Sequence, residues 1–240
     1  MSKLLSAVQK LQDYHRQGLL QGDVMPEDAN PGFDPASEEA LRYFTLPMAL
    51  NFQRNSYSLW KSALATYEDT ETRFVFDPDK VMQRAPDDVQ KALLKYKVAL
   101  QPNKHPAIWM TLCRTIEEGY KGSFLSFFKT HAYDVEKIKR ILETEKKKFP
   151  YLAGPKISNY WLYVLSQYTK LPLKNLQALS IAPDTHVIQA SVQLGLVPHG
   201  SSSLAVAEAW TKALANTDIS PIQVHTPLWL WSRQNFQPEV

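Results

Sequence analysis

Two short stretches of this 240-residue sequence carry side chains that could do chemistry. The first is LAGPK, in which Lys156 directly follows Gly154 and Pro155. Proline has the φ of a first helical residue, so a helix is predicted to begin there, with Gly154 allowing the left-handed or close-approach backbone of the preceding turn. An amine is a nucleophile only when unprotonated, and the positive end of a helix dipole disfavours its protonated form. Lys156 is therefore a candidate nucleophile; the simpler interpretation is a solvated lysine.

The second stretch is IAPDTHVIQA, in which Asp184 precedes an amphipathic helical pattern. Aspartate is a favoured N-cap, and caps are commoner than catalysts. A capping carboxylate is also held rigid and ionised, so it could stabilise a developing positive charge and orient a nucleophile. The two roles are compatible, and both stay open at this point.

The helix start after LAGPK also predicts an anion site. Its first N–H groups have no intrahelical acceptor and lie at the positive end of the helix dipole, which suits one phosphate group. The preceding helix ends in Lys146–Lys148, ordinarily a solvated helix end, but here close in sequence to the predicted site. We expect phosphate contacts from Ala153, Gly154 and Lys148.

Composition excludes several classes of protein. With 44% hydrophobic and 21% charged residues, the chain can bury a sizeable core, and a formal charge of +3 does not by itself indicate nucleic acid. The single cysteine, Cys113, excludes an intrachain disulfide and any four-cysteine zinc or iron–sulfur site, and is expected to be buried. The six histidines show no metal-ligand spacing, so we predict neither metal nor cofactor. No apolar run has the length of a membrane span or signal peptide, which favours a cytoplasmic protein, or a nuclear one in a eukaryote.

Periodicity predicts an all-α protein. A first helix ends near Gly18, and a second is predicted to begin at Thr45, with Pro47 in its first turn, and to continue through LNFQRNSYSLWKSALATY. Asp134 is expected to cap VEKIKRILETEKK, and RFVFDP to form an extended loop. Further helical patterns cover 86–99, 106–118, 122–130 and 157–168, and no convincing strand appears.

Taken together, LAGPK and PDTHV resemble two motifs of the helix-hairpin-helix superfamily of DNA glycosylases, where they are written L-x-G-x-G-x-K and V-D-T-H-V. ALNFQRNSYSLW resembles the family's opening helix, whose glutamine lies near the extruded base. HTPLWLWSR is similar to the ending of the archaeal 8-oxoguanine glycosylase branch. The resemblance spans about 46–233. This sequence has Leu152 at the first hairpin glycine, Pro183 before the aspartate, and His225 where the archaeal ending has an acid.

The resemblance implies a bifunctional DNA glycosylase and AP lyase that acts on double-stranded DNA containing a damaged base, with 8-oxoguanine as the first substrate to test. Lys156 and Asp184 would be catalytic, and Gln53, Trp229 and His225 would bind the base. It also implies two helical lobes with an active-site cleft between them, one formed by 46–173 and ending in the hairpin, the other by 1–45 and 174–240. A monomer without a membrane partner is expected.

Two other functions remain open from the sequence. The protein could be a non-catalytic helix-hairpin-helix DNA-binding protein, in which LAGPK binds phosphate while Lys156 and Asp184 are structural. It could also be an all-α interaction domain with no role on DNA. Salt-dependent binding would separate both DNA functions from the third, and strand cleavage would separate the first from the second.

Overall fold

A computed structural model describes residues 3–20, 25–52 and 54–240, and it is all-α as expected. The described residues form no β-strand, and Asp134 and Lys174 make an isolated bridge. No described helix combines the length and apolarity needed to cross a membrane. The α-helices are α1 (Lys3–Arg16), α2 (Glu38–Ala49), α3 (Ser56–Glu68), α4 (Pro78–Met82), α5 (Pro86–Lys95), α6 (Lys104–Tyr120), α7 (Phe124–Thr130), α8 (Val135–Thr144), α9 (Pro155–Tyr168), α10 (Thr185–Gln193), α11 (Ser203–Leu214) and α12 (His225–Arg233). The 3₁₀ segments are η1 (Pro26–Asp28), η2 (Arg73–Phe76), η3 (Leu176–Ala178) and η4 (Pro221–Val224).

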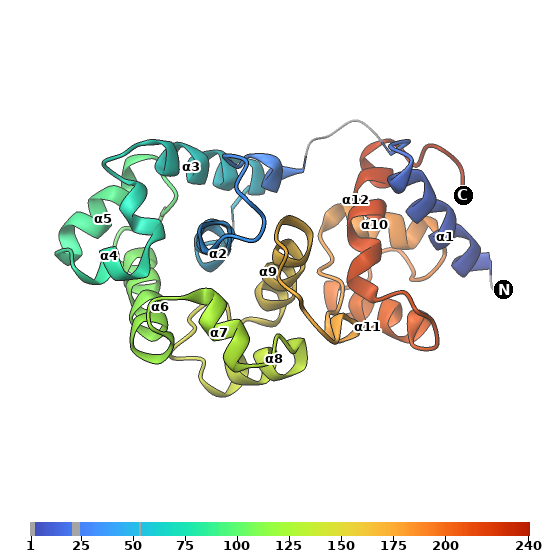
Figure 1. Cartoon of the computed structure of the whole chain (residues 1–240). Helices are drawn as coiled ribbons and strands as arrows, with labels where there is room; N and C mark the ends of the chain where they lie inside the picture. Colours follow the sequence, from blue (N-terminus) through green and yellow to red (C-terminus); the bar gives the residue numbers. More distant parts are fainter. Residues whose placement is uncertain (1–2, 21–24, 53) are drawn as a thin grey trace. The chain divides into compact units, whose positions relative to one another are not determined.

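Contacts divide the chain into two compact units. We call Met25–Asn175 the central unit, and Met1–Val24 with Leu176–Val240 the terminal unit. The central unit begins earlier than the expected boundary at Leu46, because α2 is continuous across that position and nearly all of its residues are buried. Helix α2 contacts α3, α6, α7 and α9 and lies in the middle of this unit (Figure 1).

The start of α2 differs from the prediction. The helix begins after Ser37, whose hydroxyl accepts the N–H of Ala40, and Glu38 and Glu39 favour the first turn through the helix dipole. Pro47 therefore lies in the last turn and not in the first. The predicted continuous helix is also wrong, since α2 ends at Ala49 and α3 starts again after the cap residue Asn55.

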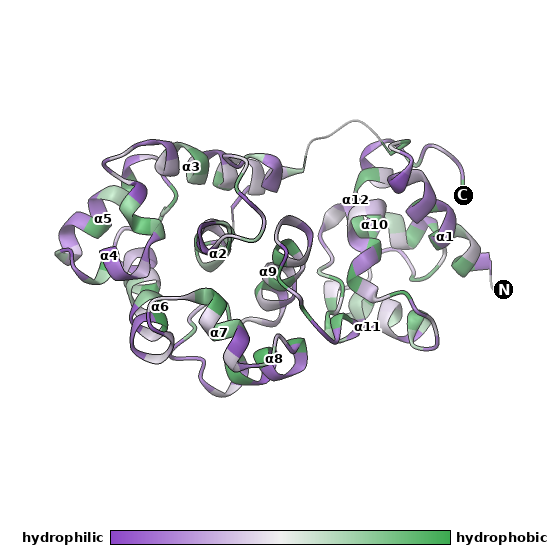
Figure 2. Ribbon diagram, in the orientation of Figure 1, coloured by the Kyte–Doolittle hydropathy of each residue, from purple (hydrophilic) through white to green (hydrophobic). Residues whose placement is uncertain are grey.

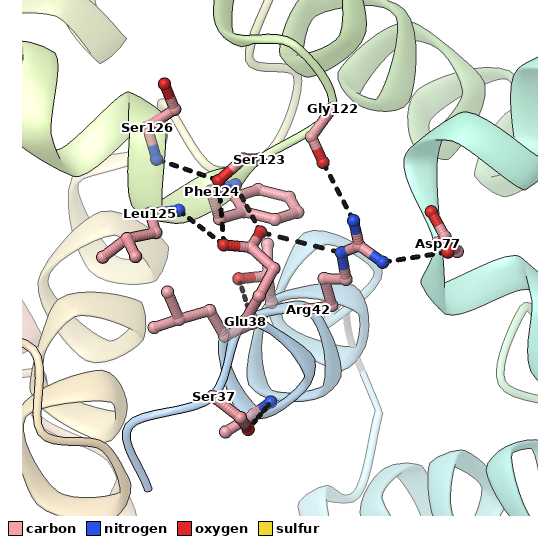
Figure 3. Close-up of polar contacts among 12 residues, drawn as sticks. Ser37, Glu38, Arg42, Asp77, Gly122, Ser123, Phe124, Leu125 and Ser126 are labelled. Carbon is pink, nitrogen blue, oxygen red and sulfur yellow. Dashed lines mark hydrogen bonds and ion pairs between the residues drawn. The ribbon is translucent and has the colours of Figure 1, made fainter.

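Glu38 also holds the start of α7 (Figure 3). Its carboxylate accepts the N–H groups of Phe124 and Leu125, at 2.6 and 3.0 Å, and the hydroxyl of Ser123 at 2.9 Å. Arg42, one turn along α2, pairs with Asp77 at 2.9 Å and donates to a carbonyl of the loop before α7. One acidic side chain thus satisfies amides at the start of a short helix that has no other charged cap.

Other local predictions have mixed outcomes. Asp134 caps α8, accepting the N–H groups of Glu136 and Lys137, and Cys113 is fully buried, as expected. RFVFDP is not extended, because it forms η2 and leads directly into α4. Figure 2 shows alternating purple and green along α8, the pattern of a helix with one apolar face.

The terminal unit is built around α12, which contacts both α10 and α1. All α12 residues from His225 to Ser232 are buried. The indole of Trp231 donates to the carbonyl of Pro238 at 2.9 Å, and that of Trp210 donates to Ser191 at 2.8 Å. Buried tryptophans in this unit therefore satisfy their N–H groups internally.

Candidate active site

The turn between α8 and α9 is anchored by apolar side chains. Phe149 and Leu152 are buried, so Leu152, which stands at the first glycine of the pattern L-x-G-x-G-x-K, belongs to the core of the turn. Tyr151 takes the left-handed conformation at φ 64°. Gly154 is extended, at φ −68°, but a Cβ built on it would lie 3.2 Å from the Tyr151 carbonyl oxygen. Of the two reasons predicted for a glycine here, close approach is the one that applies.

Helix α9 begins at Pro155, as predicted, and no side chain caps it. The first helical bond runs from the N–H of Ser158 to the carbonyl of Gly154 at 2.8 Å. The N–H groups of Lys156 and Ile157 have no acceptor among the described residues. Open amides at the positive end of the dipole of a fourteen-residue helix are the features that an anion site requires.

The residues predicted to contact phosphate are arranged around this helix start. The N–H groups of Ala153 and Gly154 already donate to carbonyls within the turn, both at 2.9 Å, so the amides left open are those of Lys156 and Ile157. Lys148 is exposed and pairs with Glu145 at 2.8 Å, which raises the pKa of Lys148. Lys156 is also exposed. The site therefore presents lysines to solvent on both sides of the turn.

The first turn of α9 is held by a side-chain contact that the sequence did not predict. The Lys139 ammonium donates to Asn159 Oδ1 at 3.1 Å, and the Asn159 amide donates to the Pro155 carbonyl at 2.6 Å. Burial lowers the pKa of Lys139. Nothing in the run KIKR distinguishes this lysine from its neighbours, so only the packing of α8 on α9 reveals the contact.

An aromatic pair next to the turn was also missed. Phe52 stacks on Tyr151, with ring centroids 5.2 Å apart and 16° between the planes. The Lys104 ammonium lies 5.4 and 5.3 Å from the two centroids. Phe52 is 36% exposed, so this aromatic pair is partly open to solvent beside a positive charge. Such a combination suits nucleic acid, because bases stack on aromatic rings and phosphates attract lysine.

Asp184 is the N-cap of α10, as predicted. Its Oδ1 accepts the N–H of Val187 at 3.0 Å. Its Oδ2 accepts the indole N–H of Trp229, also at 3.0 Å, a contact that the sequence did not reveal. The side chain is only half-buried, so the carboxylate is fixed from two sides while part of it stays accessible.

The predicted base-binding residues have separate outcomes. Gln53 lies outside the described residues. His225 begins α12 and is 4% exposed, and Trp229, one turn later, is 7% exposed. The His186 and Trp229 rings meet edge to face, with centroids 5.6 Å apart, and the Arg233 guanidinium lies over the Trp229 ring, 5.0 Å from its centroid. Asp184, Trp229 and His225 belong to the terminal unit, whereas Lys156 belongs to the central unit.

No cluster of three or more metal-ligating side chains occurs among the described residues. No protein-family model matches the sequence, and no curated protein matches it. Among solved structures, the chain is similar to a trapped endonuclease III–DNA covalent intermediate in an estranged-adenine complex, with a TM-score of 0.58 and 16% identity over 100% of this chain and 91% of that one.

The chain has the helical fold of endonuclease III. The expected all-α fold is thereby confirmed. Identity at this level speaks for the fold alone, since one fold hosts several functions and a function is argued from the site. The nearer resemblance to the archaeal 8-oxoguanine branch stays a prediction.

Proposed function

We propose that the protein is a base-excision DNA glycosylase with associated AP lyase activity, acting on double-stranded DNA that contains a damaged base. The observation that carries this proposal is the uncapped start of α9. Two open amides lie at the N-terminus of this helix, and one of them belongs to Lys156, whose exposed amine lies in the first turn. An anion site and a candidate nucleophile thus share one residue in a chain with the endonuclease III fold.

In this proposal Lys156 attacks C1′ of the damaged nucleotide. The N–C1′ bond forms as the C1′–N bond to the base breaks; the base leaves with the bonding electrons and takes up a proton, and the amine gives up one proton. The C1′–O4′ bond of the sugar then breaks, O4′ takes up a proton, and the opened sugar is left joined to Lys156 as a protonated Schiff base. Loss of a proton from C2′ then expels the 3′ phosphate and cleaves the strand. Asp184 stabilises the oxocarbenium-like charge at C1′ during departure of the base. Its two hydrogen bonds support this role, because they fix the carboxylate before the charge develops.

Recognition of the base is assigned to Gln53 and Trp229, which match the family pattern, and to His225, which stands where the archaeal ending has an acid. The base must leave the helical stack to be excised, and a protein that extrudes it has to replace the lost stacking and read its edge. 8-Oxoguanine is the first substrate to test, on the resemblance of HTPLWLWSR to the archaeal branch.

The alternative is a non-catalytic DNA-binding protein. One observation favours it: both oxygens of Asp184 are engaged within the terminal unit, which is also what a purely structural cap needs. Both functions predict binding to DNA, but only the glycosylase and lyase would convert the bound duplex to a cleaved product. Strand cleavage therefore separates them.

A panel of otherwise identical duplexes, each with one damaged base, tests the proposal. Wild-type protein is incubated with each duplex, and the strands are separated on a denaturing gel after heating with and without alkali. We expect at least one lesion to give cleavage without alkali. Salt-dependent binding to every duplex with no cleavage and no alkali-labile site would instead support the non-catalytic function.

A further inference from the structure

The carboxylate of Asp184 needs two hydrogen bonds to have a single orientation. The cap bond from Val187 fixes Oδ1 but leaves the plane of the carboxylate free to rotate about that contact. The bond from Trp229 Nε1 to Oδ2 removes this freedom, because the two donors lie on different helices, α10 and α12. The free lone pairs of the carboxylate then point in fixed directions.

Trp229 is itself held in place. Its ring meets the His186 ring nearly edge-on, at 75° between planes, and Arg233 lies over its face. An indole N–H is a donor only and does not exchange its proton in a reaction cycle. A donor of this kind facing a carboxylate can orient it and stabilise its charge, but it cannot act as an acid or a base.

We propose that Trp229 is a positioning residue that acts on the reaction through Asp184, by means of its indole N–H. This inference rests on the proposed function. It is distinct from stacking on the extruded base, because stacking uses the face of the ring while positioning uses the nitrogen. Removing the N–H and keeping the ring therefore separates the two roles.

Trp229→Phe makes that change, and Trp231→Phe is its matched control. Trp231 lies in the same helix, is also buried, and also donates its indole N–H, but to the Pro238 carbonyl. In single-turnover assays on a duplex that wild type cleaves, we expect Trp229→Phe to slow base excision about 10- to 100-fold, the cost of one hydrogen bond to a charged group. Trp231→Phe is expected to stay within about twofold of wild type.

Two further readouts exclude a merely structural effect. Borohydride trapping on a preformed abasic site does not require base excision, so it should be unchanged in Trp229→Phe. In an Asp184→Asn background, Trp229→Phe should cause no further loss, because the tryptophan acts through the carboxylate. The ¹H–¹⁵N indole signal of Trp229 should also move on Asp184→Asn, while that of Trp231 stays in place.

The inference would be overturned if Trp229→Phe excised the base at the wild-type rate. It would also be overturned if this variant lost excision and borohydride trapping on the abasic site by the same factor. If Trp229→Phe excises the base at the wild-type rate while Trp229→Leu excises it slowly, Trp229 acts by stacking alone. Absence of excision by wild type from every duplex would instead remove the proposed function, and the inference with it. An active wild type with a fully active Trp229→Phe removes only the inference.

Discussion

The hydroxyl of Tyr160, in α9, donates to the buried carboxylate of Glu27 at 2.6 Å. Glu27 lies in η1, ahead of α2, and is 1% exposed. This hydrogen bond connects the segment before α2 to α9, the helix whose first turn contains the candidate nucleophile Lys156. Burial raises the pKa of Glu27 and raises that of Tyr160 well above its usual value.

A pH dependence of stability follows from Glu27. A carboxyl group whose pKa is raised on folding stabilises the fold fully below its unfolded value, near 4.5, and loses that contribution as pH rises through the folded value. Glu27→Gln keeps an oxygen acceptor for Tyr160 and removes the ionisation. We expect a higher free energy of unfolding at pH 7 to 8, and a weaker fall in stability above pH 4.5.

Urea unfolding of wild type and Glu27→Gln between pH 4 and pH 8 measures this effect. Glu208→Gln is the control, since Glu208 is exposed on α11 and should leave the pH profile unchanged. Parallel profiles for wild type and Glu27→Gln would contradict the assignment.

The contacts of Glu38 predict a loss of stability of a different kind. Glu38→Ala removes three hydrogen bonds at the start of α7, so we expect the free energy of unfolding to fall by about 2–4 kcal/mol. Glu136→Gln is the control, because Glu136 also lies in a first helical turn and its charge acts on the helix dipole and on Lys139. We expect this variant to lose only about 0.5 kcal/mol. Equal losses for the two variants in chemical denaturation would show that the contacts of Glu38 contribute little.

Asp184→Asn should reduce base excision on the order of 100-fold by removing the charge. It should also lower stability by about 1–2 kcal/mol, because an amide group cannot accept from both Val187 and Trp229. Asp134→Asn is a matched control, since Asp134 also caps a helix with one oxygen and accepts from Asn175 with the other, at 3.0 Å. Single-turnover excision rates and melting temperatures of both variants measure the two effects. Full excision per folded molecule in Asp184→Asn would leave the residue as a cap only.

The predictable parts of this protein were those set by local rules. Asp134 and Asp184 were recognised as caps, and Pro155 as a helix start, because capping depends on a few neighbouring residues. Pro47 was misplaced by the same reasoning. A proline at the end of a helix looks like one at the beginning unless the serine and glutamates ahead of it, at 37–39, are given more weight.

The contacts that complete the site could not be predicted, because they join residues far apart in the chain. Trp229 meets Asp184 across 45 positions, and the Asn159 side chain reaches Lys139 across 20. Hydrophobic periodicity says nothing of where the Trp229 nitrogen points. A family resemblance predicted the site residues, and only packing within the terminal unit showed what holds Asp184 and Trp229.

The central claim is that Lys156 is the nucleophile, and borohydride trapping tests it most directly. Wild type, Lys156→Gln and Lys148→Gln are incubated with a duplex that wild type cleaves, in the presence of borohydride, and the covalent protein–DNA adduct is measured on a denaturing gel. Lys148 is the control, because it is an exposed lysine of the same turn. Its expected phosphate contact affects binding and not the covalent step, so the adducts are compared at a saturating protein concentration. We predict an adduct with wild type and with Lys148→Gln, and none with Lys156→Gln although that variant still binds DNA. An adduct of full yield with Lys156→Gln would contradict the claim.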